Sequence, residues 1–179
     1  GCVFFLMFPL PPRSTLFPYT PLFRSDAIVT AQNPHVFLGI HEKGQASVVH
    51  TQGNAYGHLI LRGGKNGTNY DEKSVKSAVE LLNKNNLNSQ LIIDCSHGNS
   101  NKDFRNQSKV FKSVVNQKIN GQKSIFGIML ESHLNEGNQN LTSDTKNLKY
   151  GVSITDECIG WDETSELIQW AYKIGRAHV

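Results

Sequence analysis

Apolar runs of strand length alternate with apolar stripes at helical spacing from Asp26 onward, and this alternation constrains the fold more than any other feature. Residues 58–61, 91–93 and 124–130 form the runs. Strands and helices that alternate in this way predict βαβ units on a parallel sheet. Because the runs are apolar throughout, we expect these strands to be covered on both faces. A doubly wound sheet and a (β/α)8 barrel both satisfy the pattern, so it predicts the α/β class without choosing between them.

Two helices are predicted between these runs. The first starts behind the polar residues 68–71, and the second is entered through Asn101 and Asp103. Polar side chains favour helix starts because they accept hydrogen bonds from backbone N–H groups that the helix leaves free. The apolar residues of each stripe therefore share one helix face. They are Val75, Ala78, Val79 and Leu82 in the first helix, and Phe104, Val110, Phe111, Val114, Val115 and Ile119 in the second.

Two further runs of strand length, Val36–Ile40 and Ala46–His50, precede these units. A glycine-rich stretch at 53–57 separates the second of them from the run at 58–61. Two strand-like runs joined by a glycine-containing connection are typical of a β-ribbon. We therefore expect residues 46–50 and 58–61 to pair with each other.

Both ends of the chain differ from its middle. Residues 15–25 (TLFPYTPLFRS) differ only at Pro21 from the translation of a widely used sequencing adapter, and residues 174–179 (IGRAHV) match the translation of a second adapter segment. Segments of this origin are excluded from fold reasoning. We expect residues 1–25 to be an adapter-derived, disordered artefact, residues 26–173 to be the native part, and residues 174–179 to be a second artefact.

The charge balance gives no sign of a nucleic-acid or membrane partner. Three of the 18 basic residues, Arg13, Arg24 and Arg176, lie in the two tails, which leaves the middle with equal numbers of basic and acidic residues. A basic surface for nucleic acid or anionic lipid is therefore not expected. No apolar run approaches the roughly 20 residues of a membrane span. Three cysteines do not form a disulfide framework, so we expect a cytoplasmic protein.

Residues that suit a metal or an anion follow the strand-like runs. Arg62, His97 and Glu131 each come at or shortly after the end of a run, and Asp156 follows a final short run at 152–155. In parallel α/β folds, the carboxyl ends of the strands face the active site. A guanidinium, an imidazole and two carboxylates at that edge predict a divalent metal site for an anionic substrate.

Each of these residues also has an ordinary structural interpretation. His97 could be a hydrogen-bonded or surface residue, and Asp156 could cap a helix that begins directly after it. Glu131 directly follows an apolar strand, where a carboxylate is costly unless it is paired or coordinated. Arg62 could neutralise a neighbouring acid, and Gly63 could be an ordinary turn residue. Taken one at a time, the residues do not establish a site.

Four longer segments resemble signature segments of the type I 3-deoxy-D-arabino-heptulosonate 7-phosphate (DAHP) synthases. They occur in the order and at the spacing of that family, and the resemblance extends over essentially all of residues 26–172. The segments are LRGGKNGTNYDEKSV at 61–75, IDCSHGNSNKDFRNQ at 93–107, ESHLNEGNQ at 131–139 and YGVSITDECIGWDET at 150–164.

The resemblance implies a partial (β/α)8 TIM barrel with the C-terminal strands and helices only. In that family, a divalent metal of the Mn, Fe, Co or Zn class is held by Cys, His, Glu and Asp, and the last three match His97, Glu131 and Asp156. The phosphoenolpyruvate-binding arginine matches Arg62. The resemblance thus implies catalytic roles for His97 and Arg62, and substrate contacts for Arg62, His97 and Asp156. The metal-binding Cys lies in the family's N-terminal half, which is absent here, and Cys95 does not replace it.

The implied activity is the condensation of phosphoenolpyruvate with erythrose 4-phosphate, which gives DAHP and phosphate and opens the shikimate pathway to aromatic amino acids. We expect the chain to be inactive by itself and the full-length protein to be a homo-oligomer. One alternative is a related phosphoenolpyruvate-dependent sugar-phosphate condensing enzyme, such as 3-deoxy-octulosonate 8-phosphate synthase. Another is a non-catalytic, barrel-derived binding domain. The segments at 61–75 and 150–164 argue against the first, and the joint presence of the four site residues argues against the second.

Overall fold

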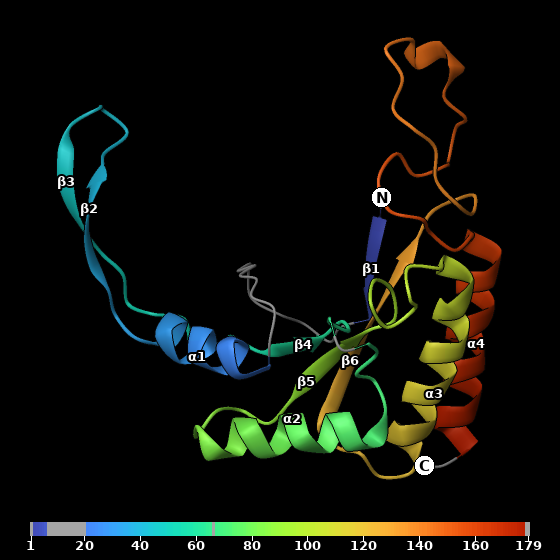
Figure 1. Ribbon diagram of the computed structural model, residues 1–179, viewed down its shortest axis with the longest axis horizontal. Helices are drawn as coiled ribbons and strands as arrows, with labels where there is room; N and C mark the ends of the chain where they lie inside the picture. Colours follow the sequence, from blue (N-terminus) through green and yellow to red (C-terminus); the bar gives the residue numbers. More distant parts are fainter. Residues whose placement is uncertain (1, 7–20, 66, 178–179) are drawn as a thin grey trace.

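The structure is a mixed α/β fold built on three parallel strands. Strands β4 (Leu59–Leu61), β5 (Leu91–Asp94) and β6 (Ile125–Ser132) lie side by side, with β5 in the middle. Helix α2 (Glu72–Lys84) connects β4 to β5, and helix α3 (Gln107–Ile119) connects β5 to β6 (Figure 1). The parallel pairing confirms the predicted βαβ units. This computed structural model describes residues 2–6, 21–65 and 67–177.

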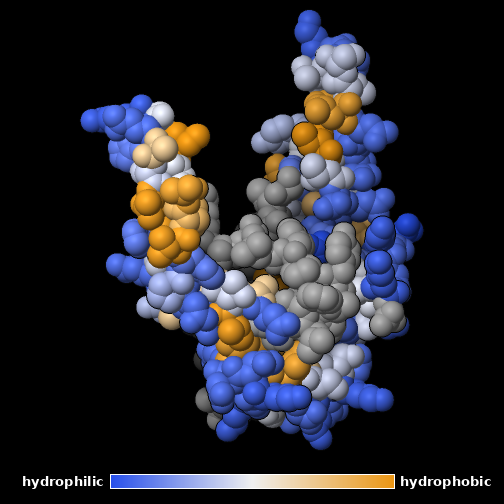
Figure 2. All heavy atoms as spheres, turned by 60° about the vertical axis from the view of Figure 1, so that its left-hand side comes forward, coloured by the Kyte–Doolittle hydropathy of each residue, from blue (hydrophilic) through white to orange (hydrophobic). Residues whose placement is uncertain are grey.

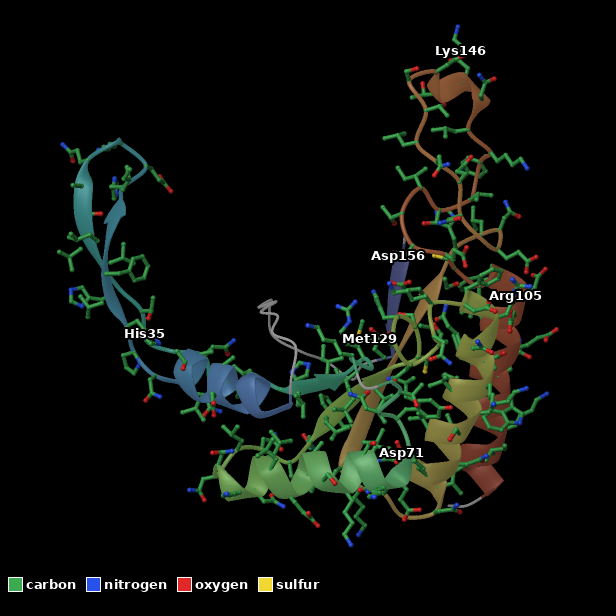
Figure 3. The ribbon with its side chains drawn as sticks, viewed as in Figure 1. His35, Asp71, Arg105, Met129, Lys146 and Asp156 are labelled. Carbon is green, nitrogen blue, oxygen red and sulfur yellow. The ribbon has the colours of Figure 1, made fainter. Side chains whose placement is uncertain are left out.

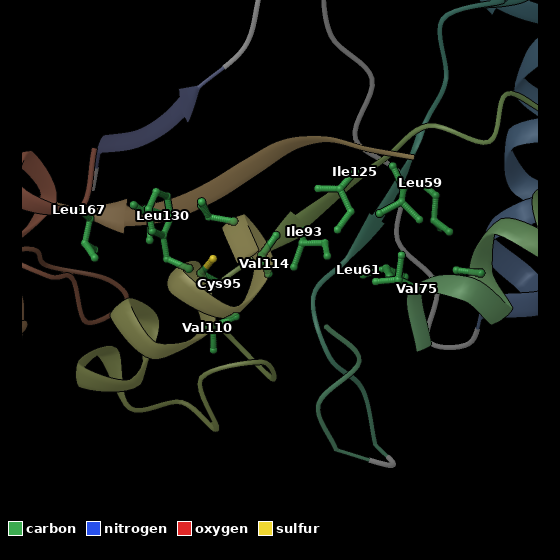
Figure 4. Close-up of a cluster of buried hydrophobic side chains, with 14 of the residues drawn as sticks. Leu59, Leu61, Val75, Ile93, Cys95, Val110, Val114, Ile125, Leu130 and Leu167 are labelled. Atoms are coloured by element: carbon green, nitrogen blue, oxygen red, sulfur yellow. The ribbon is translucent and has the colours of Figure 1, made fainter. Parts of the chain in front are cut away.

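The core lies where the helices cover these strands. All four residues of β5 are buried, which confirms for this strand the prediction of cover on both faces. Side chains from β4, β5, β6, α2 and α3 form one apolar cluster, and helix α4 (Trp161–Ala177) adds Leu167 to it. Phe111 of α3 also packs against Trp170 of α4, with ring centroids 6.5 Å apart. Figure 4 shows members of this cluster, among them Leu61, Val75, Ile93, Val114 and Leu130.

Helix α2 begins where its polar start predicts. Asp71 is the N-cap residue, and its carboxylate accepts hydrogen bonds from the backbone N–H of Ser74 at 3.0 Å and from the Ser74 hydroxyl at 2.6 Å (Figure 3). The helix then buries Val75, Ala78 and Leu82 against the sheet. The hydrogen bond from the Ser74 side chain lowers the pKa of Asp71 below its ordinary value of 3.8.

Replacing Asp71 with alanine is expected to lower the free energy of unfolding by about 1 kcal/mol, the usual cost of a lost N-cap. Because the pKa of Asp71 is lower in the folded state, the ionised carboxylate stabilises the fold at pH values above its ordinary pKa. This stabilisation is lost as pH falls through the folded pKa. The wild type and Asp71→Ala should therefore converge in stability at the acidic end of a series of urea titrations. The matched control is Asp144→Ala, which removes the cap of an exposed 3-10 helix, η2 (Thr145–Asn147), that buries no residue. Equal losses in both variants would contradict the prediction.

A β-ribbon is present, but residues 46–50 pair with a different strand from the one that we expected. Strand β2 (Val36–Ile40) pairs antiparallel with β3 (Ala46–His50), whereas residues 59–61 form β4 and pair in parallel with β5. The predicted pairing of 46–50 with 58–61 is therefore wrong. The connection at 41–45 is short enough for a hairpin, and it brings two strands together that the glycine-rich stretch does not.

The β2–β3 hairpin stands away from the rest of the molecule (Figure 1). Leu38 is 82% exposed and Ile40 is 81% exposed, so the described part of the chain leaves the apolar side chains of this strand uncovered. Figure 2 shows apolar side chains gathered on this projecting arm. Helix α1 (Pro21–Gln32) precedes the hairpin in the chain.

Helices and strands are described close to both ends of the chain, within parts of the segments that we expected to be adapter-derived. Strand β1 (Cys2–Leu6) pairs antiparallel with β6, α1 begins at Pro21, and α4 continues to Ala177. Residues 7–20 and 178–179 lie outside the described residues, and the expectation that residues 1–25 are disordered stays a prediction. The adapter origin of both tails stays a prediction as well. Within the described part of the chain, no helix is long and apolar enough to cross a membrane.

Candidate functional site

The four residues predicted from the sequence line one cleft at the carboxyl ends of the parallel strands. Arg62 follows the last residue of β4, His97 lies three residues beyond the end of β5, and Glu131 is the penultimate residue of β6. The cleft has a volume of about 890 Å³, and Asp156 reaches it from the loop after β6. Lys65 and Lys102 add two further cationic side chains to its lining.

His97, Glu131 and Asp156 form a compact group. The Nε2 atom of His97 lies 3.3 Å from Oε1 of Glu131 and 3.8 Å from Oδ2 of Asp156. One potential ligand atom from each residue lies within 4.8 Å of those from the other two. Glu131 and His97 are largely shielded from solvent, whereas the Asp156 side chain is 71% exposed. An imidazole nitrogen and two carboxylate oxygens at these separations can bind one divalent ion between them.

Asp156 reaches the group from an irregular segment. The short run at 152–155 forms only a single β-bridge, in which Ser153 pairs with Asn138. Figure 3 shows Asp156 near the carboxyl end of β6. Helix α4 begins at Trp161, so Asp156 is not its cap, and that structural interpretation is excluded. The loop is held back onto β6 by hydrogen bonds from His133 N–H to the Ile159 carbonyl and from Ile159 N–H to the Glu131 carbonyl, each 3.0 Å.

Asp94 and Ser96 orient the imidazole of His97. The Nδ1 atom of His97 lies 2.8 Å from Oδ2 of Asp94, and because a carboxylate only accepts, Nδ1 carries the proton. The hydroxyl of Ser96 donates to the other oxygen of Asp94 at 2.6 Å and also lies 2.6 Å from Nδ1 of His97. When the imidazole is neutral, Nε2 therefore keeps its lone pair on the side of Glu131 and Asp156, which is the tautomer that a metal-binding imidazole needs.

The pKa values at the site reflect these contacts. The hydrogen bond to Asp94 raises the pKa of His97 above its ordinary value, although burial opposes it. Burial raises the pKa of Glu131, and the nearby His97 opposes that shift. The positive charge of Arg62 opposes the rise of both pKa values, but only weakly beside the other causes. The site therefore combines a cationic side and an acidic side within one cleft.

The loops after β4 and β5 approach each other backbone to backbone. Gly63 adopts a φ of 76°, and a Cβ atom there would lie 2.5 Å from the carbonyl carbon of Gly98. The N–H of Gly98 donates to the carbonyl of Arg62 at 3.0 Å. Gly63 is therefore more than an ordinary turn residue, because its missing side chain lets the Arg62 loop dock onto the His97 loop.

Sequence reasoning missed three residues that support the site. Asp94 is 2% exposed and ends strand β5 directly after the apolar run at 91–93, so the cost of a buried carboxylate, which singled out Glu131, also applies to it. Asn99 and Gln107 are equally buried, but no local pattern distinguishes them from surface amides. Cys95 is buried in the apolar cluster (Figure 4), so its side chain packs in the core and does not belong to the candidate metal site.

Parallel strands that bring an imidazole, two carboxylates and a guanidinium to one edge define an α/β protein with a candidate metal- and anion-binding site. Comparison with known proteins gives the family. Residues 23–169 match the family described as the DAHP synthetase I family, and the chain belongs to that family.

Individual relatives agree with this assignment. The chain is 49% identical over 145 residues to a putative phospho-2-dehydro-3-deoxyheptonate aldolase of Schizosaccharomyces pombe, a match that covers 80% of this chain and 39% of the relative. It is 45% identical over 150 residues to the phenylalanine-inhibited aldolase of Saccharomyces cerevisiae, covering 80% of this chain and 40% of the relative. The solved structure of the Francisella tularensis aldolase aligns with a TM-score of 0.81 at 36% identity, over 89% of this chain and 46% of that one. The chain thus spans less than half the length of these relatives.

Proposed function

We propose that the protein to which this chain belongs is a DAHP synthase, which condenses phosphoenolpyruvate with erythrose 4-phosphate and releases DAHP and phosphate. The observation that carries the proposal is the group of His97, Glu131 and Asp156 beside Arg62 in one cleft. The relatives are named heptonate aldolases, and these names support a heptulosonate product over an octulosonate product. The step would open the shikimate pathway to aromatic amino acids.

The parallel β4–α2–β5–α3–β6 order supports part of a (β/α)8 barrel as the complete architecture. Each of its two crossovers carries a helix, as in barrels, and the candidate ligands cluster at the carboxyl ends of its strands. The homo-oligomeric state of the full-length protein and its cytoplasmic location stay predictions.

The residues present fit a divalent metal of the Mn, Fe, Co or Zn class. His97 supplies a nitrogen, and Glu131 and Asp156 supply oxygens, a donor set that these ions share. The N–H of His97 donates to Asp94, as expected when the other ring nitrogen binds a metal. When bound, such an ion would act as a Lewis acid toward the aldehyde of the sugar phosphate.

The chain's own residues account for substrate binding and orientation. Arg62 presents a planar guanidinium that can donate two parallel hydrogen bonds to the carboxylate or phosphate of phosphoenolpyruvate. Lys65 and Lys102 add positive charge to the same cleft, which favours a pair of substrates that each carry a phosphate. His97 lies between the acidic and the cationic sides, where it can contact both the metal and phosphoenolpyruvate. Asp156, the exposed member of the group, can contact the sugar as it enters.

The proposal is tested by joining residues 26–173 to the part of the Francisella tularensis relative that lies outside the match. We expect this fusion to consume phosphoenolpyruvate with erythrose 4-phosphate, to stop with a chelator and to recover with a divalent transition metal. The 179-residue chain by itself should give no turnover. A fusion that prefers arabinose 5-phosphate would favour the octulosonate alternative, and a folded fusion that turns over neither sugar would favour the binding domain.

Replacing Arg62 with lysine in this fusion is expected to weaken phosphoenolpyruvate binding while metal binding is kept. Lysine retains the charge but loses the two-pronged geometry of the guanidinium. One charged hydrogen bond contributes about 1.5–3 kcal/mol, which corresponds to roughly 10- to 150-fold in the dissociation constant. Isothermal titration with phosphoenolpyruvate and metal analysis on the same sample measure both properties. Lys146→Arg, on the exposed η2 segment, is the control. Loss of metal with unchanged phosphoenolpyruvate affinity would contradict the assigned role.

A further inference from the structure

Two buried amide side chains tie the strand ends of the site together. Asn99 is 2% exposed and Gln107 is 0% exposed, and both belong to the segment that follows β5. We propose that Asn99 and Gln107 are positioning residues, whose amides hold the backbone that carries Arg62, His97 and Glu131. This inference rests on the metal site proposed above and adds residues that do not touch the metal or the substrate themselves.

Gln107 fixes the backbone of Glu131. Its Oε1 atom accepts the N–H of Glu131 at 2.9 Å, and its Nε2 donates to the carbonyl of the same residue at 3.2 Å. The side-chain amide thus pairs with both polar backbone groups of Glu131 at once, as a neighbouring strand would. The same carbonyl also accepts the N–H of Ile159, which leads back toward Asp156. One side chain of α3 therefore sets where the Glu131 carboxylate leaves the strand.

Asn99 fixes the loops that carry the other two residues. Its Nδ2 donates to the carbonyl of Leu61 at 3.1 Å and to the carbonyl of Asp94 at 2.8 Å, which joins the last residues of β4 and β5. Its Oδ1 accepts the N–H of Asn69 at 2.8 Å, and the Oδ1 of Asn69 in turn accepts the N–H of Gly63 at 2.7 Å. Arg62 therefore lies between two backbone positions that this amide network holds.

Burial and backbone conformation both indicate that this network acts on the site. A buried amide is costly unless its polar atoms are paired, and the amides of Asn99 and Gln107 pair with backbone groups at or next to the site. The segment also holds His97 at a φ of 52° and Lys102 at a φ of 60°, conformations that persist only where the surroundings determine them. Asp156 is the exposed member of the group, and we expect it to adapt to the ligand.

The test compares two glutamines of the same helix in the 179-residue chain. Gln107→Met removes the paired amide without changing side-chain length, whereas Gln117→Met removes one hydrogen bond from α3 to the carbonyl of Tyr70, outside the site. Titration with Co²⁺ alone measures affinity, and its visible absorption reports ligand geometry. We expect Gln107→Met to bind Co²⁺ about 10- to 100-fold more weakly with an altered spectrum, the range for residues that orient ligands. Gln117→Met should bind like the wild type.

Gln107→Glu keeps the acceptor for the Glu131 N–H and loses the donor to the Glu131 carbonyl. A Co²⁺ affinity between those of the wild type and Gln107→Met would therefore support the inference. Amide hydrogen exchange provides a readout without metal, because Gln107→Met should speed exchange at Glu131 far more than at Ile92. Co²⁺ affinity and spectrum like the wild type in Gln107→Met would overturn the positioning role, as would unchanged exchange at Glu131. A wild-type chain that binds no Co²⁺ would instead count against the proposed metal site, and the exchange measurement would still decide on the amide.

Discussion

Replacing His97, Glu131 or Asp156 with alanine is expected to weaken divalent metal binding by more than about 100-fold. Residues that only orient a metal ligand typically contribute about 10–100-fold, and direct ligands should exceed that range. His97 and Glu131 should show the largest losses, because each is shielded from solvent and fixed through a neighbouring residue. Competition titrations with Co²⁺ and Mn²⁺ in the 179-residue chain, with unfolding followed in parallel, measure these losses.

Two nearby residues supply matched controls. His133 lies two residues beyond Glu131, and Glu157 lines the cleft directly beside Asp156, yet neither belongs to the group of three. His133→Ala and Glu157→Ala should therefore keep wild-type metal affinity. If Glu157→Ala lost as much affinity as Asp156→Ala, the two carboxylates would be acting through general negative charge. Full affinity in Glu131→Ala would remove that residue from the ligand set.

The regular part of the fold could be predicted because its signals are local. The apolar stripe of α2 and its cap at Asp71 lie within one stretch of 12 residues, and burial of β5 follows from its continuous apolarity. The β2 run, VFLGI, is also free of polar side chains, yet it is largely exposed. Whether an apolar run is covered depends on which distant segments pack on it, and the run itself carries no information about that. The same limit explains the wrong partner in the predicted ribbon.

The sequence predicted the metal-binding and charged residues of the candidate site, but it did not predict the buried amides that hold them in place. His97, Glu131 and Asp156 follow strand-like runs, and the family resemblance singled them out. Their proximity depends on a loop that is irregular around Asp156, where the short apolar run forms no regular strand. Asn99 and Gln107 gave no signal at all, because a polar side chain in a polar stretch has the composition of a surface residue. Their role appears only when strand ends far apart in sequence come together, as when Gln107 meets Glu131.

Replacing Gly63 with alanine is expected to lower the free energy of unfolding by about 2–5 kcal/mol and to disrupt the cleft. An L-residue held at left-handed φ costs about 1–2 kcal/mol, and overpacking against a fixed neighbour adds about 1–3 kcal/mol. The new methyl group would lie 2.5 Å from the carbonyl carbon of Gly98 and 2.7 Å from the N atom of Asn99. Neither atom can move aside easily. The N–H of Gly98 donates a hydrogen bond to the carbonyl of Arg62, and the side-chain amide of Asn99 donates to the carbonyls at the ends of β4 and β5.

The glycines of the same loop separate the two causes. Among the described residues, a methyl group on Gly64 would meet no heavy atom within 4 Å, and Gly64 has no left-handed φ, so Gly64→Ala should be close to neutral. Gly67 has a φ of 105° but equally open space, so Gly67→Ala should show the cost of backbone strain alone. Urea unfolding of the three variants should therefore rank the loss at Gly63 above that at Gly67, and the loss at Gly67 above that at Gly64. Because Gly63→Ala pushes the Arg62 loop away from the His97 loop, its Co²⁺ affinity should fall as well, whereas Gly67→Ala should keep it. If Gly63→Ala were no less stable than Gly67→Ala, the close approach of the two loops would not be a constraint on this site.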